Sequence, residues 1–175
     1  RRSDWPTALR FHPASAYRVS PPEPKCLGNF PALIARIQDI EGRVVSLQRI
    51  YLGEDGKKLV LADPHTGEML PAKKAMPPIY PGALNGAAVH LDDPDEGGRI
   101  MLAEGVETAL AAGSLSKWPV WACVSAHGLQ RVQLPPAIVQ VVIAADRDSS
   151  GTGQRAAEML ANRLVAEGRE VRILL

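Results

Sequence analysis

Short apolar runs separated by polar turns dominate the second half of the chain. They predict four buried strands, at residues 99–103, 120–124, 138–145 and 170–175. Alanine-rich or amphipathic segments at 108–115 and 154–167 predict helices, and Gly168 is placed to end the second one. Residues 125–128 predict a turn after the second strand. Strands alternating with helices in this way predict a parallel sheet with right-handed crossovers.

The first half has shorter and less regular apolar runs. Residues 44–51 alternate well enough for a strand, and residues 30–38 favour one. An Asp-Gly turn predicts a hairpin that returns along residues 59–62, and residues 87–91 predict another short strand. Residues 1–29 are rich in Pro, Arg and small residues, which indicates an extended segment on the surface rather than a packed element.

These patterns divide the chain into three predicted parts. An extended segment at 1–29 precedes a small, mainly antiparallel β subdomain at 30–98, and an α/β domain follows at 99–175. The acidic loop at 92–98 is the predicted boundary between the last two parts. A length of 175 residues allows one domain of ordinary size and a smaller appendage.

Composition narrows the function classes only slightly. Aromatic residues make up 5% of the chain, so a stacking platform for single strands is not expected, and a net charge of +1 does not by itself indicate a nucleic-acid partner. Cys26 and Cys123 form neither a zinc pattern nor a disulfide framework, which favours a reducing, cytoplasmic location. No apolar run approaches the length of a membrane span, so no membrane partner is expected.

Acidic residues follow two of the predicted strands. Glu104 comes directly after residues 99–103, and Asp146 and Asp148 follow the run VVIAA at 141–145. Ligands of parallel sheets bind at the carboxyl ends of the strands, so the three carboxylates converge if these two strands are neighbours. Like charges at such distances need a cation or a proton, and Mg²⁺ suits oxygen ligands with open positions for phosphate. For each acid taken alone, an ordinary solvated turn is the alternative.

These motifs resemble the Toprim domain, which bacterial-type primases, type IA and II topoisomerases and some nucleases share. The matching stretches are MLAEGVETALA at 101–111 and VVIAADRDSSGTGQRAAE at 141–158. The segments EGVETALA, VSAHGL, RFHP, FPALIARI, DGKK, AKKAM and GAAVHL are similar to primase-like Toprim proteins of phages, plasmids and other mobile elements. The resemblance implies an α/β fold: a Toprim (Rossmann-like) domain with a central, mostly parallel four-stranded sheet, after a small mainly β subdomain.

The resemblance also implies roles for the acids. Glu104 would act as general acid or base, while Asp146 and Asp148 would hold Mg²⁺, for which Mn²⁺ can substitute. From its place at the end of a strand, Glu104 is also a candidate ligand of the ion. Many primases carry an aspartate four positions after this glutamate, where this chain has Thr108. Glu107 stands beside it and either replaces that acid or simply begins a helix, where a negative charge suits the helix dipole.

Several basic residues are candidates for contacts with substrate or nucleic acid. Two lysine pairs match basic positions of the family's β subdomain, Lys57 with Lys58 and Lys73 with Lys74. They would bind template or NTP phosphates, although surface lysines also serve solubility alone. Arg147 either neutralises phosphate charge or points away from the strand end. His127 is a candidate substrate contact or a plain turn histidine.

The resemblance therefore implies Mg²⁺-dependent nucleotidyl transfer by a DNA primase-type fragment. Such a fragment makes an RNA primer from NTPs on single-stranded DNA during replication of a mobile element, with a replicative helicase as a further partner. A Toprim nuclease that cleaves phosphodiesters is one alternative, and a catalytically silent nucleic-acid-binding or docking module is another. A topoisomerase is disfavoured because the three tyrosines, at positions 17, 51 and 80, all lie in the first half.

Overall fold

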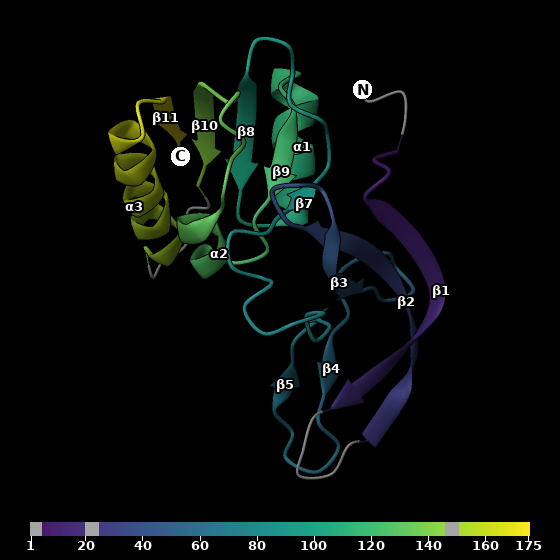
Figure 1. Ribbon diagram of the computed structural model, residues 1–175. Helices are drawn as coiled ribbons and strands as arrows, with labels where there is room; N and C mark the ends of the chain where they lie inside the picture. The colour runs from purple at the N-terminus through teal and green to yellow at the C-terminus, as the bar shows by residue number, and fades with distance from the viewer. Residues whose placement is uncertain (1–4, 20–24, 146–150) are drawn as a thin grey trace.

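Two main β-sheets lie side by side in the computed structural model, which describes residues 5–19, 25–145 and 151–175 (Figure 1). The first sheet has the strand order β1-β2-β3-β6 and is antiparallel throughout. Its strands are β1 (Leu9–Val19), β2 (Lys25–Gln38), β3 (Val44–Tyr51) and β6 (Lys73–Ala75). A small two-stranded ribbon of β4 (Leu61–Ala62) and β5 (Met69–Leu70) extends from this part of the chain.

The second sheet has the order β11-β10-β8-β9-β7, and four of its five strands are parallel. The parallel strands are β8 (Arg99–Ala103), β9 (Val120–Ala122), β10 (Gln140–Ala144) and β11 (Glu170–Leu174). All four were predicted, and the mostly parallel arrangement is confirmed. The sheet also has a fifth member, β7 (Val89–His90), which pairs antiparallel with β9 at the edge although it precedes the predicted boundary at residue 98.

Helices cover both faces of the second sheet, as expected for strands that are apolar along most of their length. α2 (Ala126–Arg131) and α3 (Thr152–Ala166) share one hydrophobic cluster with the sheet, whereas α1 (Val106–Ser116) packs in the cluster of the opposite face. α3 buries an apolar stripe that includes Leu160 and Leu164, and Gly168, at φ +85°, follows its end as predicted. In the part of the chain that the structure describes, no helix is long and apolar enough to cross a membrane.

The N-terminal region differs from the extended surface segment predicted for residues 1–29. β1 pairs with β2 from Leu9 opposite Ala35 to Val19 opposite Lys25, with two irregularities in register. Leu9 and Tyr17 are completely buried on this strand. The composition did not predict this strand, because only a few of its residues are apolar and buried and because its hydrogen-bonding partner comes later in the chain.

The Asp-Gly turn forms only the first part of the predicted hairpin between residues 44–51 and 59–62. The N–H of Leu59 donates to the carbonyl of Tyr51 at 2.9 Å, but β4 does not join the sheet of β3. β3 pairs instead with β2 and β6, and an isolated bridge between Leu52 and Lys58 spans the turn. β4 pairs with β5 across the next turn, where the Asp63 carboxylate accepts hydrogen bonds from two backbone N–H groups. The local turn signal was therefore correct at the turn itself, whereas long-range pairing of β3 with β2 and β6 keeps the hairpin short.

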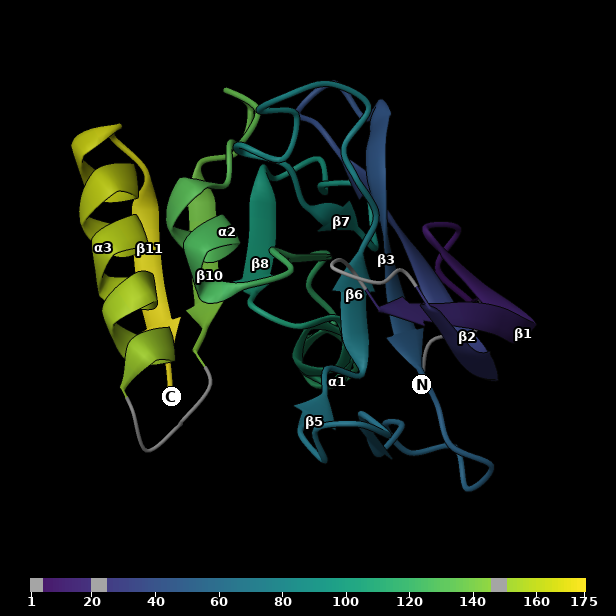
Figure 2. The same cartoon turned by 90° about the horizontal axis from the view of Figure 1, so that it is seen from below.

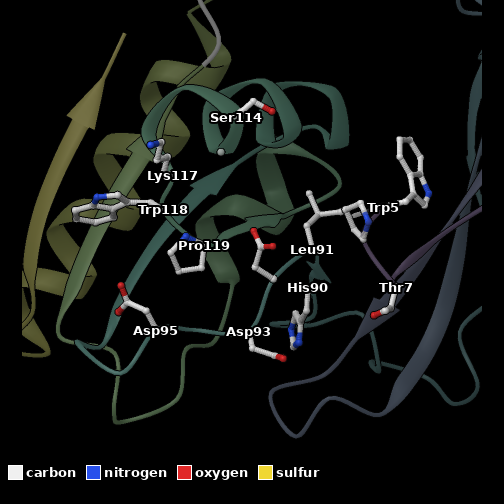
Figure 3. A pocket seen from close by; sticks show the side chains of 13 residues that line it. Trp5, Thr7, His90, Leu91, Asp93, Asp95, Ser114, Lys117, Trp118 and Pro119 are labelled. Atoms are coloured by element: carbon white, nitrogen blue, oxygen red, sulfur yellow. The ribbon is translucent and has the colours of Figure 1, made fainter. Parts of the chain in front are cut away.

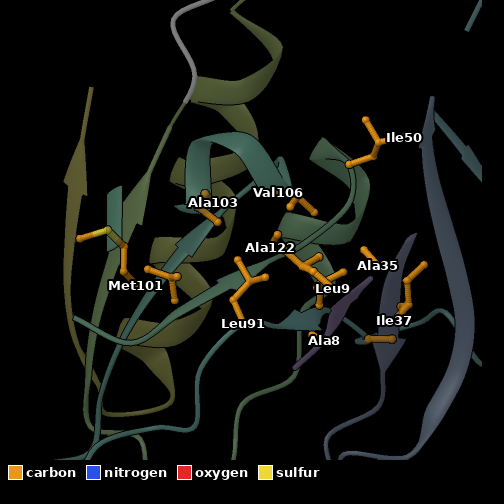
Figure 4. Packing of buried hydrophobic residues seen from close by; sticks show 14 of the residues in the cluster. Ala8, Leu9, Ala35, Ile37, Ile50, Leu91, Met101, Ala103, Val106 and Ala122 are labelled. Atoms are coloured by element: carbon orange, nitrogen blue, oxygen red, sulfur yellow. The ribbon is translucent and has the colours of Figure 1, made fainter. Parts of the chain in front are cut away.

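One hydrophobic cluster joins the two sheets (Figure 4). Leu9, Ile37 and Ile50 from the antiparallel sheet pack with Val106 of α1 and Ala122 of β9. The backbones are also linked, because the end of β2 and the residue before β7 exchange two hydrogen bonds of 2.7 and 2.9 Å. The antiparallel sheet is therefore held against the α1 face of the parallel sheet, and this contact positions the basic strand β6 beside α1 (Figure 2).

Candidate active site

The carboxyl ends of β8 and β10 lie side by side. The predicted acidic site requires this arrangement, because its carboxylates converge only if the two strands are neighbours. The two strands are paired in parallel, with Ala103 opposite Ala144. Glu104 is the first residue after β8, and its side chain is partly buried. Asp146, Arg147 and Asp148 lie outside the described residues, which resume at Gly151 before α3.

Glu104 lies close to the end of β9 as well as at the end of β8. Burial raises the pKa of the Cys123 thiol, and the nearby negative charge of Glu104 raises this pKa further. The backbone N–H of Cys123 donates a 2.8 Å hydrogen bond to the carbonyl of Ala103, the residue before Glu104. Glu104 is thus held between neighbouring strand ends, at the edge where α/β sheets bind their ligands.

The turn from β9 into α2 has a strained backbone that was not predicted. Val124 has φ +72°, a conformation that is unfavourable for a β-branched residue, and the N–H of Ser125 donates to the Cys123 carbonyl at 2.8 Å. The Ser125 hydroxyl caps α2 by accepting from the N–H of Gly128 at 3.1 Å. This segment was predicted as a turn, and the Ser-x-x-Gly spacing was the available signal for the cap.

Two predicted basic residues and one predicted acid converge beside Glu104. The Lys73 ammonium lies 2.8 Å from the Glu107 carboxylate, and the Lys58 ammonium lies 3.4 Å from its other oxygen. Partial burial acts to raise the pKa of Glu107, but the hydrogen bond and positive charge of Lys73, aided by Lys58, outweigh it and lower that pKa. Lys73 Nζ is also 3.4 Å from where a Cβ on Gly105 would lie, so the cluster borders the Glu104-Gly105 turn.

The other members of the two lysine pairs have different surroundings. Lys57 is highly exposed and lies 3.6 Å from the carboxylate of Asp55. Lys74 follows Lys73 on β6 and therefore points to the opposite face of the sheet. There its ammonium donates to the carbonyl of Arg18 and lies 4.8 Å from the centre of the Tyr17 ring, and burial lowers its pKa. Only one lysine of each pair is directed toward the Glu107 cluster.

The remaining candidate residues are less informative. His127 lies in the first turn of α2, after the strained turn, and its side chain is exposed. Among residues 5–19, 25–145 and 151–175, no group of three or more His, Cys, Asp or Glu side chains is arranged to hold a metal ion. Two of the three predicted ligands, Asp146 and Asp148, do not belong to those ranges.

A separate cavity of about 680 Å³ opens at the other end of α1 (Figure 3). Trp5, His90 and Trp118 contribute to its walls together with acidic residues of the loop that follows β7. Two of these acids already have roles in the fold. Asp92 accepts a hydrogen bond from the N–H of Val120, and Asp95 forms an ion pair with Arg99. α1 has eleven residues, so this cavity is separated from Glu104 by roughly 16 Å of helix.

Comparison with known families identifies the second half of the chain. Residues 99–175 match the sequence model of the Toprim domain. This region is a Toprim domain. Residues 1–86 match a model that is described only as a domain of unknown function, DUF7146. A comparison with curated proteins gave no match.

The Toprim domain and the preceding β region together are similar to solved DNA primases. The Aquifex aeolicus primase, with its zinc-binding and RNA polymerase domains, aligns with a TM-score of 0.54 and 19% identity, over 89% of this chain and 37% of that one. A DnaG primase catalytic domain bound to single-stranded DNA gives 0.53 and 16%, over 90% and 47%. The primase fragment of the bacteriophage T7 primase-helicase protein gives 0.51 and 20%, over 83% and 53%. The chain thus spans about half or less of each relative, and at such low identities the structural similarity shows a shared fold alone.

Proposed function

We propose that this protein carries out Mg²⁺-dependent nucleotidyl transfer of the primase type, joining ribonucleotides into an RNA primer on single-stranded DNA. The observation that carries the proposal is the adjacency of β8 and β10 in the Toprim domain, since each strand leads into an acidic motif. The fold supports it, because the solved relatives are DNA primases and one of them is bound to single-stranded DNA.

A divalent cation fits the proposed donor set. Toprim domains generally depend on Mg²⁺, and the predicted ligands are all carboxylates, which a hard cation prefers. Glu104, Asp146 and Asp148 would hold the ion, which when bound supplies charge neutralisation for the transferred phosphate and activation of the attacking hydroxyl. Glu104, partly buried at the end of β8, would accept the proton of that hydroxyl.

The antiparallel sheet would supply positive charge to the same reaction. Lys73 borders the Glu104-Gly105 turn and Lys58 lies against Glu107, where their ammonium groups would attract the phosphates of a nucleotide or template. In this proposal residues 30–98 form the subdomain that supplies Lys58 and Lys73, and residues 99–175 form the catalytic domain. A replicative helicase of a mobile element fits as a partner, since one solved relative is the primase fragment of a primase-helicase protein.

Primer synthesis by the purified chain tests the proposal. The chain is incubated with single-stranded DNA, labelled NTPs and Mg²⁺, and the products are separated by length. Glu104→Gln, Asp146→Asn and Asp148→Asn should each lower the rate by about 100-fold or more, because each removes proton transfer or charge stabilisation at the reacting phosphate. Glu158→Gln, an exposed acid on α3, is the matched control and should retain the rate.

The products also decide between the activities. NTP-dependent oligoribonucleotides support primase chemistry, shortened DNA or RNA would instead indicate a nuclease, and neither product would indicate a binding module. Mn²⁺ titration of the same variants gives a second measurement. If Asp146→Asn and Asp148→Asn kept both the metal affinity and the activity of the wild type, the assignment of the ligands would be wrong.

A further inference from the structure

Glu107 is the meeting point of two cations that come from separate segments of the antiparallel region. Lys58 lies in the loop between β3 and β4, and Lys73 begins β6, yet both ammonium groups are within 3.4 Å of the same carboxylate. The Lys73 side chain is 30% exposed and that of Glu107 is 43% exposed, so the cluster is accessible from solvent. Two ammonium groups gathered around one carboxylate would repel each other if that anion were absent.

We propose that Lys58 and Lys73 form a phosphate-binding site that Glu107 occupies in the free protein, so that a phosphate group of the substrate must displace the Glu107 carboxylate to bind. The inference deepens the proposed function by assigning regulation at the same site. A phosphate group offers more negative charge and more acceptor oxygens than a carboxylate, which favours the exchange. Glu107 is then an internal competitor of the substrate rather than an additional metal ligand.

The geometry supports displacement rather than simple addition. Glu107 lies in the first turn of α1, three positions after Glu104, and its carboxylate contacts both lysines as well as its own backbone N–H. Lys58 is 58% exposed and is carried by a loop, so it can follow an incoming anion. Lys73 is held by β6 next to Gly105, which fixes one side of the site near the candidate reaction centre.

Binding of inorganic tripolyphosphate in the presence of EDTA tests this inference without catalysis or metal. Glu107→Gln should bind tripolyphosphate about fivefold more tightly than the wild type, because the competing charge is gone while the side chain keeps its size. Lys73→Ala should bind it about fivefold more weakly, and Glu107→Gln combined with Lys73→Ala should lose the gain. Glu167→Gln is the matched control, because this acid also pairs with two cations but lies beyond α3.

The outcomes separate this inference from the proposed function. Unchanged or weaker tripolyphosphate binding by Glu107→Gln would overturn it, as would an equal gain in Glu167→Gln, and so would no binding by any of the variants. A loss of Mn²⁺ affinity in Glu107→Gln would also overturn it, because this result identifies a metal ligand. Absence of primer synthesis alone would count against the proposed function, since tripolyphosphate binding in EDTA does not depend on the reaction.

Discussion

The antiparallel sheet and the parallel sheet bring opposite charges to the surface where they meet. The parallel sheet contributes Glu104 and Glu107, at the end of β8 and the start of α1. The antiparallel region contributes Lys58 and Lys73. The end of a buried strand and the first turn of a helix hold the acids, whereas a loop and a three-residue edge strand hold the cations. The proposed chemistry and the proposed phosphate binding therefore rest on different kinds of secondary structure.

The two sheets nevertheless share one core, and the largest expected effect tests this connection. Ile50 of β3 is buried in the cluster that also contains Val106 and Ala122 of the Toprim domain. Ile50→Ala should lower the free energy of unfolding by about 3 kcal/mol, because it leaves a cavity between the sheets. Urea titration followed by far-UV circular dichroism and by tryptophan fluorescence should give one coincident transition with both probes.

Val60→Ala is the control for this substitution, because Val60 is 79% exposed and should change the stability by less than about 0.5 kcal/mol. Trp118 precedes β9 and Trp121 lies in it, so fluorescence measured in a Trp5→Phe background reports on the parallel sheet. Separate transitions for the two probes in Ile50→Ala would mean that the sheets unfold independently, and the shared-core argument would then fail.

The second prediction concerns the turn between β9 and α2, and it tests whether the backbone of this turn can adjust to a larger side chain. A Cβ on Gly128 would lie 2.0 Å from the carbonyl oxygen of Cys123, so the backbone must shift in Gly128→Ala. We expect a loss of about 2 kcal/mol in the free energy of unfolding, measured by urea titration. Gly97→Ala, whose new Cβ would have its nearest contact at 3.4 Å, is the matched control and should be nearly neutral. Equal stability of the two variants would show that this turn is adaptable.

The parallel region was predicted more completely than the antiparallel region, and the reason is physical. Strands such as 99–103 are apolar along most of their length because both faces are covered, so their pattern is visible locally. β1 has only a few buried anchors, such as Leu9 and Tyr17, and its identity depends on a partner later in the chain. Local patterns cannot reveal such a partner, so the strand was predicted as an extended segment.

The candidate site shows the same division. Glu104 was predicted from its place after an apolar strand, and the pairing of β8 with β10 agrees with the expected neighbours. The sequence could not separate Lys58 from Lys57 or Lys73 from Lys74, because facing depends on strand register and loop path. The strained backbone at Val124 was also unpredictable, since nothing in a Val-Ser step indicates a positive φ. Asp146 and Asp148 stay predictions.

The third prediction concerns how protonation of His90 changes the stability of the protein. His90 lies in β7, the strand between the antiparallel sheet and the Toprim domain in sequence. His90 of β7 stacks on Trp121 of β9, with ring centres 3.6 Å apart, and burial lowers its pKa to about 4, although the charges of Asp39 and Asp93 oppose this shift. As the pH falls, His90 of the unfolded state therefore takes up its proton at a higher pH than His90 of the folded state. The contribution of His90 is complete above pH 6.5 and is lost as the pH falls toward 4.

We expect His90 to account for a loss of about 1–2 kcal/mol in the free energy of unfolding between pH 7 and pH 4, less than the full shift implies because the ring is partly exposed. Urea titrations at several pH values measure it, with His90→Phe as the reference, since phenylalanine keeps the ring and does not titrate. An identical pH dependence of the two proteins would show that His90 is not the titrating group and that other side chains cause the loss.

The smallest expected effect concerns Lys57, the chain neighbour of Lys58. Lys57 is 84% exposed and lies near Asp55, so Lys57→Ala should change tripolyphosphate affinity by less than about twofold at physiological salt, where distant charges are screened. Lys58→Ala removes the same formal charge one residue later and should weaken binding about fivefold, because Lys58 lies against Glu107. Calorimetry in EDTA compares the two variants. Equal losses would mean that the antiparallel region attracts phosphate by its total charge, whereas unequal losses would indicate a site of defined geometry at the junction of the two sheets.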